Sequence, residues 1–443
     1  MIRVEETVTI AGDSQEGRPS APPSEPVQRE RMKYVIIQGD GMADEPLAAF
    51  GNRTPLEVAR TPSFDRIGGK GRLGLLHTIP DGLPPGSDVG NLSLFGYNPR
   101  EFYTGRSPLE AAAMGVPLGP DDVSFRMNLV TLGQNGEIGN AGGPNRDNDV
   151  MEDYSGGHIE TEQAARMLNS IAAELQTDQV QFYPGVSYRH LIVWRHGEMG
   201  MTTTPPHDIS GKAIAKYLPA GAGSERLREI MRRSREILAH HPENQKRIQA
   251  GQKPITQGWI WGQGKAPRMP MFRERYGLKG ACISAVDLVR GVAVYAGFDI
   301  IPVPGATGFL DTNYRGKGEY ALKALADHDL IFVHIEAPDE AGHMGNAEEK
   351  VKAIEAIDRE VAGPLLEKLP KLGPFKILIT SDHATPVARR THVAAPVPFA
   401  MATGEQLQNA HPLLKYGETE ATKTGVEIRD GFRVIETLKG YPE

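Results

Sequence analysis

The chain has 443 residues, of which 39% are apolar and 24% charged, as in an ordinary globular protein with a large buried core. Its formal net charge of −7 argues against a surface that binds nucleic acid, and no segment has the roughly 20 consecutive apolar residues that a membrane helix needs. The single cysteine, Cys282, cannot form an intramolecular disulfide, which favours a reducing, cytoplasmic setting and a role as a small core residue.

Residues 1–31 differ in composition from the rest of the chain. Residues 20–26 include three prolines among small and polar residues, and residues 28–31 are all polar or charged. No apolar signal-peptide core is present. Such a segment buries too little apolar surface to fold, so we expect a disordered tail, with Met32 as a candidate natural start.

Three short apolar runs lead directly into polar, chemically active residues. They occupy residues 34–37, 330–333 and 377–379. Continuous apolar runs are typical of strands that are buried on both faces of a parallel sheet. Between the second and third runs, apolar residues recur at helical spacing from Val351 to Val361, and Pro364 is expected to end this helix. Alternating strands and helices predict an α/β fold with a doubly wound, mostly parallel sheet.

The middle of the chain has a different pattern. Apolar residues at helical spacing predict amphipathic helices around residues 168–175 and 227–238, and residues 191–194 form a strand-like run. We therefore expect residues 120–272 to form a smaller α+β domain that is inserted into the first one. The larger, discontinuous domain then comprises residues 32–119 and 273–443.

Acidic residues and histidines follow the three apolar runs, where a parallel sheet brings its strand ends together. The candidate metal ligands are Asp40, Asp339, His343, Asp382, His383 and His392. Asp339 and His343 are one helical turn apart, so both can face one point. Mixed nitrogen and oxygen ligands suit manganese, zinc or cobalt, and six ligands are about right for two ions. Each residue alone would more often be structural, but their joint placement favours a metal centre.

Ser87 follows a proline- and glycine-containing turn and precedes a segment that can begin a helix. A serine at this position is usually a helix cap. Its alternative role is that of a nucleophile, because a nearby metal ion lowers the pKa of a hydroxyl and helix amides favour a phosphate.

Five motifs occur in an ordered set. They are Gly39-Asp40-Gly41-Met42-Ala43-Asp44, Pro85-Gly86-Ser87-Asp88-Val89-Gly90-Asn91, Tyr103-Thr104-Gly105-Arg106, Asp339-Glu340-Ala341-Gly342-His343 and Ser381-Asp382-His383-Ala384-Thr385-Pro386. Together and in this order they resemble the archaeal-type branch of the cofactor-independent phosphoglycerate mutases, within the alkaline phosphatase superfamily. The resemblance extends from about Lys33 to the carboxyl terminus, and it implies an alkaline phosphatase-like fold.

The resemblance also implies two divalent metal ions and no requirement for 2,3-bisphosphoglycerate. Manganese is the first expectation, with zinc, cobalt and magnesium as alternatives. One ion would be held by Asp339, His343 and His392. The other would be held by Asp40, Asp382, His383 and the oxygen of Ser87.

The reaction that the resemblance implies interconverts 3-phosphoglycerate and 2-phosphoglycerate, in glycolysis and gluconeogenesis, through a phosphoserine at Ser87. The protein's partner would thus be a small phosphorylated molecule. His158 resembles a family histidine that lies near the substrate, although it can equally be the flank of the helix that follows it. Proton exchange with the glycerate hydroxyls is the role that His158 would have.

An anionic substrate needs cationic side chains, and Arg189 and Lys265 are the candidates. Each can instead be a solvated surface charge. Asp208 would contact the glycerate hydroxyls or cap a helix, and Arg106 is a further candidate for an anion contact.

Residues 187–190 and 259–265 resemble a bacterial subgroup of the family for which a homoserine kinase role has been proposed. The predicted metal ligands would serve either reaction, because they handle only the phosphoryl group. The Gly264-Lys265 pair is followed by Ala266 and lacks the other residues of an ATP-binding phosphate loop. A homoserine kinase-like phosphotransferase or a phosphatase acting on another small substrate is the alternative. A non-catalytic binding protein is disfavoured, since every expected ligand residue is present.

Overall fold

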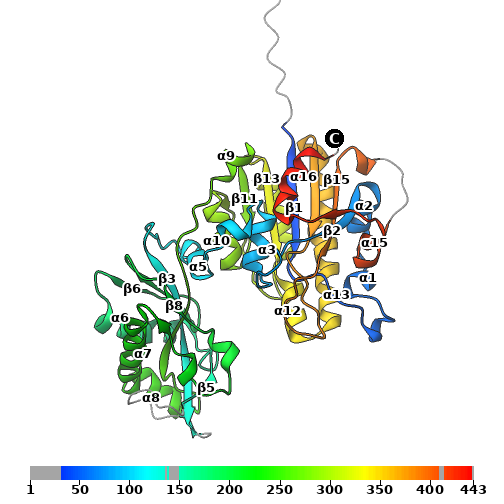
Figure 1. Ribbon diagram of the computed structural model, residues 1–443. Coiled ribbons are helices and arrows are strands. Elements are labelled where there is room, and N and C mark those ends of the chain that lie inside the picture. Colours follow the sequence, from blue (N-terminus) through cyan, green and yellow to red (C-terminus); the bar gives the residue numbers. More distant parts are fainter. Residues whose placement is uncertain (1–30, 135–136, 139–148, 409–413, 442–443) are drawn as a thin grey trace, which may run out of the picture.

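The computed structural model describes residues 31–134, 137–138, 149–408 and 414–441 (Figure 1). The predicted tail lies outside this part of the chain, apart from Arg31. Two sheets organise the structure, a large sheet of eight strands and a small sheet of six. No helix in the described ranges combines the length and the apolar character that crossing a membrane requires.

The large sheet has the strand order β12-β11-β13-β1-β14-β15-β2-β16. Its strands are β1 (Lys33–Gly39), β2 (Arg72–Leu76), β11 (Gly280–Ile283), β12 (Asp299–Ile300), β13 (Leu330–Ile335), β14 (Phe375–Thr380), β15 (Val397–Thr403) and β16 (Glu427–Ile428). Neighbouring strands are parallel except at β15, which is antiparallel to both β14 and β2. The prediction of a mostly parallel α/β sheet is confirmed.

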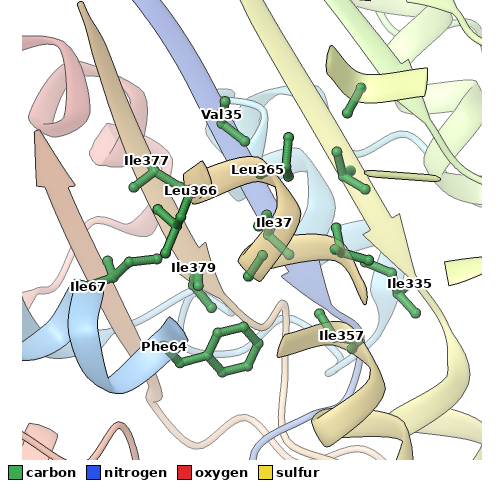
Figure 2. Packing of buried hydrophobic residues seen from close by; sticks show 14 of the residues in the cluster. Val35, Ile37, Phe64, Ile67, Ile335, Ile357, Leu365, Leu366, Ile377 and Ile379 are labelled. Atoms are coloured by element: carbon green, nitrogen blue, oxygen red, sulfur yellow. The ribbon is translucent and has the colours of Figure 1, made fainter. Parts of the chain in front are cut away.

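Helices cover both faces of the large sheet, which explains why its strands are continuously apolar. Val35 and Ile37 of β1 lie in a cluster with Phe64 and other residues on one face (Figure 2). Tyr34 and Ile36 point to a second cluster on the opposite face. Complete burial of a side chain such as Ile37 stabilises the fold by about 1.5–3 kcal/mol. The fold is thus doubly wound, as the sequence predicts.

The helices of the large-sheet unit belong to these two layers or to the loops at the strand ends. They are α1 (Pro55–Val58), α2 (Pro62–Lys70), α3 (Ser87–Leu94), α4 (Pro99–Phe102), α5 (Ser107–Ala113), α9 (Phe272–Tyr276), α10 (Asp287–Tyr295), α11 (Tyr314–Ala324), α12 (Ala337–Met344), α13 (Ala347–Ala356), α14 (Gly363–Lys368), α15 (Glu418–Lys423) and α16 (Val434–Gly440). Cys282 lies in β11 and is fully buried, so its predicted place in the core is confirmed.

The prediction that the helix from Val351 ends at Pro364 is wrong. A π-helical turn, Ile357–Ala362, joins α13 to α14, and Pro364 lies in the first turn of α14. Within that turn the Gly363 N–H donates to the Asp358 carbonyl, five residues earlier. A proline ring would normally clash with the preceding helical turn, and the wider π turn leaves room for it.

The small sheet has the strand order β10-β3-β7-β6, with β4 and β5 also paired to β3, and all its pairs are antiparallel. Its strands are β3 (Val123–Gln134), β4 (Glu137–Ile138), β5 (Val150–Asp153), β6 (Val180–Tyr183), β7 (Arg189–Trp194) and β10 (Gln257–Gly264). Beside it lie α6 (Thr161–Leu175), α7 (Ser224–Ala239), α8 (Pro242–Gln249) and the ribbon of β8 (Met201–Thr202) and β9 (Ala220–Gly221).

The strands of the two sheets come from separate stretches of the chain. The small sheet uses residues 123–264, and the large sheet uses residues on either side of that stretch (Figure 1). The domain boundaries at 119/120 and 272/273 remain predictions. Helix α5 lies where the two units meet: Ser107 Oγ donates to the Ser124 carbonyl of β3 at 2.8 Å.

Candidate active site

Parallel strand pairing brings the predicted ligands to one edge of the large sheet. Gln38 of β1 pairs with His334 of β13 on one side and with Thr380 of β14 on the other. The residues that follow these strands therefore emerge next to one another. Asp40 comes after β1, and Asp382 comes after β14.

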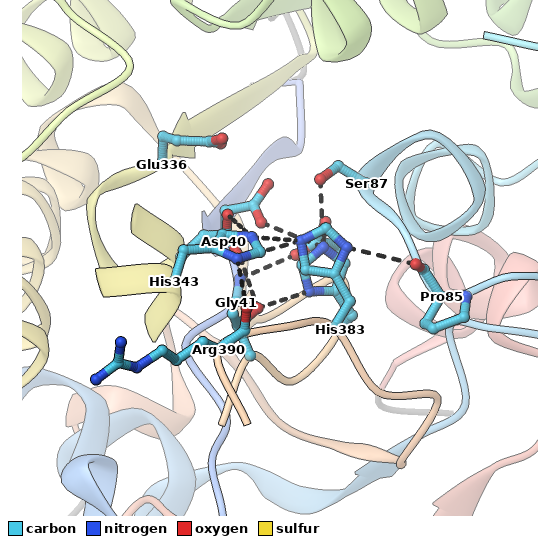
Figure 3. Close-up of polar contacts among 12 residues, drawn as sticks. Asp40, Gly41, Pro85, Ser87, Glu336, His343, His383 and Arg390 are labelled. Carbon is cyan, nitrogen blue, oxygen red and sulfur yellow. Dashed lines mark hydrogen bonds and ion pairs between the residues drawn. The ribbon is translucent and has the colours of Figure 1, made fainter. Parts of the chain in front are cut away.

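Asp40, Asp382 and His383 form the first of three compact groups of potential ligands (Figure 3). All three are fully buried. His383 Nε2 lies 3.2 Å from Asp382 Oδ2 and 3.5 Å from Asp40 Oδ1. We call this group the serine-side group, because the Ser87 Oγ atom lies 3.2 Å from the same His383 nitrogen.

Ser87 is the first residue of α3, and close packing brings it to the serine-side group. A Cβ atom on Gly90 would lie only 2.6 Å from the Asp382 carbonyl oxygen, so only glycine allows α3 to approach this closely. Asn91 Nδ2 donates to the Ser87 carbonyl at 2.8 Å and to Asp382 Oδ2 at 3.2 Å. The helix thereby holds its first residue against the ligands.

Asp339, His343 and His392 form the second group, which we call the helix-side group. Asp339 and His343 lie one turn apart on α12, and His392 comes from the loop between β14 and β15. His343 Nε2 lies 3.2 Å from Asp339 Oδ2, and His392 Nε2 lies 3.5 Å from Asp339 Oδ1.

The tautomers of the helix-side histidines fit a bound cation. The Nδ1 atoms of His343 and His392 face the backbone carbonyls of Arg390 and Pro85 at 3.1 and 3.4 Å, and carbonyls only accept hydrogen bonds. Each Nε2 of the neutral rings therefore carries a lone pair, and these two atoms lie 2.8 Å apart. Two lone pairs at that distance repel each other, and a cation that both nitrogens bind would remove the repulsion.

The serine-side group fits a cation for a similar reason. His383 Nδ1 lies 3.1 Å from the hydroxyl of Thr385, so in the tautomer with hydrogen on Nδ1 the Nε2 lone pair faces two carboxylates. Asp40 Oδ1 is buried and has no hydrogen-bond partner among the described residues. An uncompensated buried carboxylate is costly, and a divalent cation supplies the missing charge.

The pKa values of the ligands also show that the carboxylates of the site need positive charge to balance them. Burial raises the pKa of Asp40 well above its usual range, and the charges of Asp382 and nearby carboxylates add to the rise. Burial also lowers the pKa of His383. The hydrogen bond with Asp339 raises the pKa of His343 to about 9. Burial alone would raise the pKa of Asp339, but its histidine partners outweigh burial and lower that pKa. A bound cation would favour ionised carboxylates and neutral imidazoles instead.

Comparison with known proteins decides the family. A family model for 2,3-bisphosphoglycerate-independent phosphoglycerate mutase matches residues 69–244. A probable 2,3-bisphosphoglycerate-independent phosphoglycerate mutase of Geobacter sulfurreducens is 53% identical over 407 residues, which cover 92% of this chain and 99% of the relative. The chain belongs to the 2,3-bisphosphoglycerate-independent phosphoglycerate mutase family. This mutase family is a family of isomerases and depends on metal.

Other members of the mutase family are also similar to this chain over most of its length. The enzyme of that name from Methanosarcina mazei is 49% identical over 373 residues, or 84% of this chain and 90% of the relative. A solved structure of a Pyrococcus horikoshii protein matches with a TM-score of 0.74 and 30% identity, covering 92% of this chain and 96% of that one. The cofactor-independent phosphoglycerate mutase of Thermoplasma acidophilum matches with a TM-score of 0.61 and 25% identity, covering 92% and 99%.

Sequence analysis of this family member did not select three polar residues of the site. His334 and Glu336, at the end of β13, form a third group with Asp40, in which His334 Nε2 lies 2.8 Å from Asp40 Oδ2. Thr385 contacts ligands of both groups. The signal for His334 and Glu336 was their place at the end of an apolar strand, and the signal for Thr385 was its place two residues after His383.

His158 and Arg189 of the mutase chain come together on the small-sheet unit. The His158 ring lies 6.1 Å from the ring of Tyr188, over which the Arg189 guanidinium lies at 5.0 Å. Burial, and then the charges of Glu336 and Asp339, raise the pKa of Glu340 on α12 to about 7. The Arg189 guanidinium is close enough to Glu340 to oppose this rise. Arg189 therefore lies within electrostatic range of Glu340, the residue next to the ligand Asp339.

The remaining predicted substrate residues are Arg106, Lys265 and Asp208. Arg106 precedes α5, and its Nε atom is buried without a hydrogen-bond partner among the described residues. Lys265 Nζ lies 3.9 Å from Asp121, and Lys265 is tied through its carbonyl to Thr104. The Asp208 side chain is 61% exposed, and its carboxylate lies 3.6 Å from His207, which is not one of the predicted metal ligands. Their roles in binding substrate remain predictions.

Proposed function

We propose that the protein interconverts 3-phosphoglycerate and 2-phosphoglycerate by phosphoryl transfer through Ser87, as a cytoplasmic enzyme of glycolysis and gluconeogenesis. The observation that carries this proposal is the position of Ser87. Its hydroxyl lies at the amino end of α3, 3.2 Å from His383 Nε2 and beside two buried carboxylates. Capping does not account for this serine, because Gly86, not Ser87, is the N-cap residue of α3.

The two groups of ligands define the metal centres of the proposal. Asp339, His343 and His392 would hold one divalent cation, and Asp40, Asp382, His383 and Ser87 Oγ would hold the other. Manganese is our first choice, with zinc, cobalt and magnesium as alternatives. When bound, the two cations would supply Lewis-acid polarisation of the phosphoryl oxygens and a lower pKa for a serine hydroxyl.

Ser87 exchanges the phosphoryl group with the substrate in two steps. In the first step, Ser87 Oγ loses its proton and forms a bond to phosphorus, while the bond between phosphorus and O3 of glycerate breaks and O3 takes a proton. In the second step, O2 of the retained glycerate loses its proton and attacks the same phosphorus, and Ser87 Oγ leaves and regains a proton. The positive end of the α3 dipole favours the phosphate at this position.

His158 and Arg189 supply the substrate side of the reaction. His158 would exchange protons with the O2 and O3 hydroxyls of glycerate, and Arg189 would bind its carboxylate with two parallel hydrogen bonds. The support is their shared neighbour, Tyr188, and a link between their loops: Ser187 Oγ donates to the Ile159 carbonyl at 2.6 Å. Holding both groups on one small-sheet surface lets glycerate turn without dissociating.

The test measures product formation and the phosphoenzyme together. Purified protein with Mn²⁺ is assayed for conversion of 3-phosphoglycerate to 2-phosphoglycerate, in parallel with homoserine plus ATP and with release of free phosphate. A Ser87→Ala variant should lose isomerisation and the phosphorylated serine that mass spectrometry detects in the wild type. Ser93→Ala is the matched control, because Ser93 lies on the same helix but donates to the Thr78 carbonyl.

Each result separates the proposal from its alternative. Isomerisation that is lost in Ser87→Ala and kept in Ser93→Ala supports the mutase reaction. Homoserine phosphorylation without isomerisation would overturn the proposed substrate and favour the kinase-like alternative. Phosphate release without isomerisation would indicate a phosphatase, and an active Ser87→Ala variant would overturn the role of the serine.

A further inference from the structure

Thr385 lies between the two groups of metal ligands and contacts both. Its Oγ1 atom lies 2.5 Å from Asp339 Oδ1 of the helix-side group and 3.1 Å from His383 Nδ1 of the serine-side group. Thr385 is fully buried, so water does not compete for these contacts. One hydroxyl thus joins a ligand of each group.

The chemistry of the partners sets the direction of the two hydrogen bonds. An ionised Asp339 carboxylate only accepts, so it receives the single hydrogen of the Thr385 hydroxyl. The hydroxyl oxygen must then accept the Nδ1 hydrogen of His383, which places the His383 lone pair on Nε2, the atom that faces Ser87 and the serine-side carboxylates. The position of the Asp339 carboxylate against Thr385 therefore selects the tautomer of His383 that can bind a cation.

Thr385 is itself held in place by backbone contacts. Its N–H donates to the Ala43 carbonyl at 3.2 Å, and its own carbonyl accepts from Lys350 Nζ at 2.8 Å. Ala43 lies three residues after Asp40, so the same contacts tie Thr385 to the loop that carries another serine-side ligand. These contacts fix the main chain of Thr385 beside ligands of both groups.

We infer that Thr385 is a positioning residue that couples the loading of the two metal centres. A cation in the helix-side group holds the Asp339 carboxylate in one orientation, which fixes the Thr385 hydroxyl and leaves His383 Nε2 free to bind. By thermodynamic reciprocity, a cation on His383 favours the same hydroxyl orientation and so favours binding at Asp339. The inference rests on the two-metal part of the proposed function.

The test is a Mn²⁺ titration of metal-free protein, with free Mn²⁺ followed by electron paramagnetic resonance. The wild type should bind two Mn²⁺ per chain with a Hill coefficient above 1. Thr385→Ala removes the hydroxyl and should reduce the Hill coefficient to 1 or below and weaken binding about 10- to 100-fold, the usual effect of losing a group behind a metal ligand. Thr385→Ser keeps the hydroxyl and should restore both values.

Thr78→Ala is the matched control. Thr78 is fully buried like Thr385, but its hydroxyl has no hydrogen-bond partner among the described residues. The same substitution there removes the same atoms without touching a ligand, so Mn²⁺ binding should match that of the wild type. Thermal unfolding in chelator measures any general loss of stability in both variants.

Four outcomes would contradict the coupling. Wild-type protein that binds two Mn²⁺ independently would overturn it without any variant, which keeps the test decisive even if Thr385→Ala does not fold. Wild-type cooperativity in Thr385→Ala, or failure of Thr385→Ser to restore it, would show that the hydroxyl is not responsible. Fewer than two Mn²⁺ on the wild type would overturn the two-metal proposal itself, and stoichiometry alone distinguishes that failure from the others.

Discussion

Lys350 Nζ lies 2.7 Å from Asp44 Oδ2, and both side chains are completely buried. The ammonium group also donates to the carbonyls of Ala43 and Thr385, at 3.1 and 2.8 Å. These two loops carry ligands of both metal groups. A buried cation on α13 therefore holds the loop after β1 against the loop after β14.

Replacement of Lys350 by methionine should destabilise the protein strongly. The substitution leaves the Asp44 carboxylate buried without its counter-charge, which costs about 3–5 kcal/mol in comparable cases. Urea unfolding of the metal-free protein measures the change. Lys352→Met on the same helix is the control, because Lys352 pairs with Glu349 at the surface and should matter little. Equal unfolding midpoints for the two variants would contradict the prediction.

The stability of the metal-free protein should fall as the pH rises from about 6.5 to 9. The hydrogen bond with Asp339 raises the pKa of His343 from 6.5 to about 9 in the folded state. Between these values the folded protein binds a proton that the unfolded chain has released, so the stabilisation is complete below pH 6.5 and lost above pH 9. Thermal unfolding in chelator across this range, compared with His343→Gln, measures it. A wild-type slope no steeper than that of the variant would contradict the assignment.

Gly41→Ala should remove metal binding. Gly41 has a φ of +56°, and a Cβ atom there would lie 2.5 Å from both Asp339 Oδ1 and Thr385 Oγ1. The methyl group would displace a ligand atom of the helix-side group and the hydroxyl that contacts both groups. Metal content after purification with Mn²⁺ is the measurement.

The control for that variant is Gly51→Ala. Gly51 has a similar φ of +65° but has open space around the position of a Cβ atom. Both variants should lose about 1–2 kcal/mol from backbone strain, but only Gly41→Ala should lose metal. Normal metal content in Gly41→Ala would show that the site tolerates displacement of these ligands.

His158→Asn should lower kcat by about 10²- to 10⁴-fold while leaving Mn²⁺ content unchanged, since the residue would transfer protons without binding metal. Asparagine is chosen because His158 has a φ of +52°, a conformation that asparagine tolerates. His196→Asn is matched in residue, substitution and backbone, since His196 is exposed with a φ of +50°. Similar kcat values for the two variants would assign His158 to the flank of α6 instead.

Local patterns were sufficient to predict much of the large sheet and its ligands. Ile377 and the residues beside it form an uninterrupted apolar run that is typical of a strand covered on both faces, and Asp382 and His383 follow two residues after it ends. The helix through Pro364 could not be predicted in this way. A π-helical turn depends on how the surrounding helices pack, and a proline signals only that an ordinary turn is unfavourable.

The sequence by itself determined the fold class, the family and the identity of the predicted metal ligands. The reason is that a buried strand and the polar residues that follow it are adjacent in the chain. Only the tertiary structure decided that Thr385 lies between the two groups of ligands and contacts both. It also placed His334 against Asp40, residues that are 294 positions apart in the chain. These relationships depend on strand register and helix packing, which bring distant segments within hydrogen-bond distance and leave no local signal in the sequence.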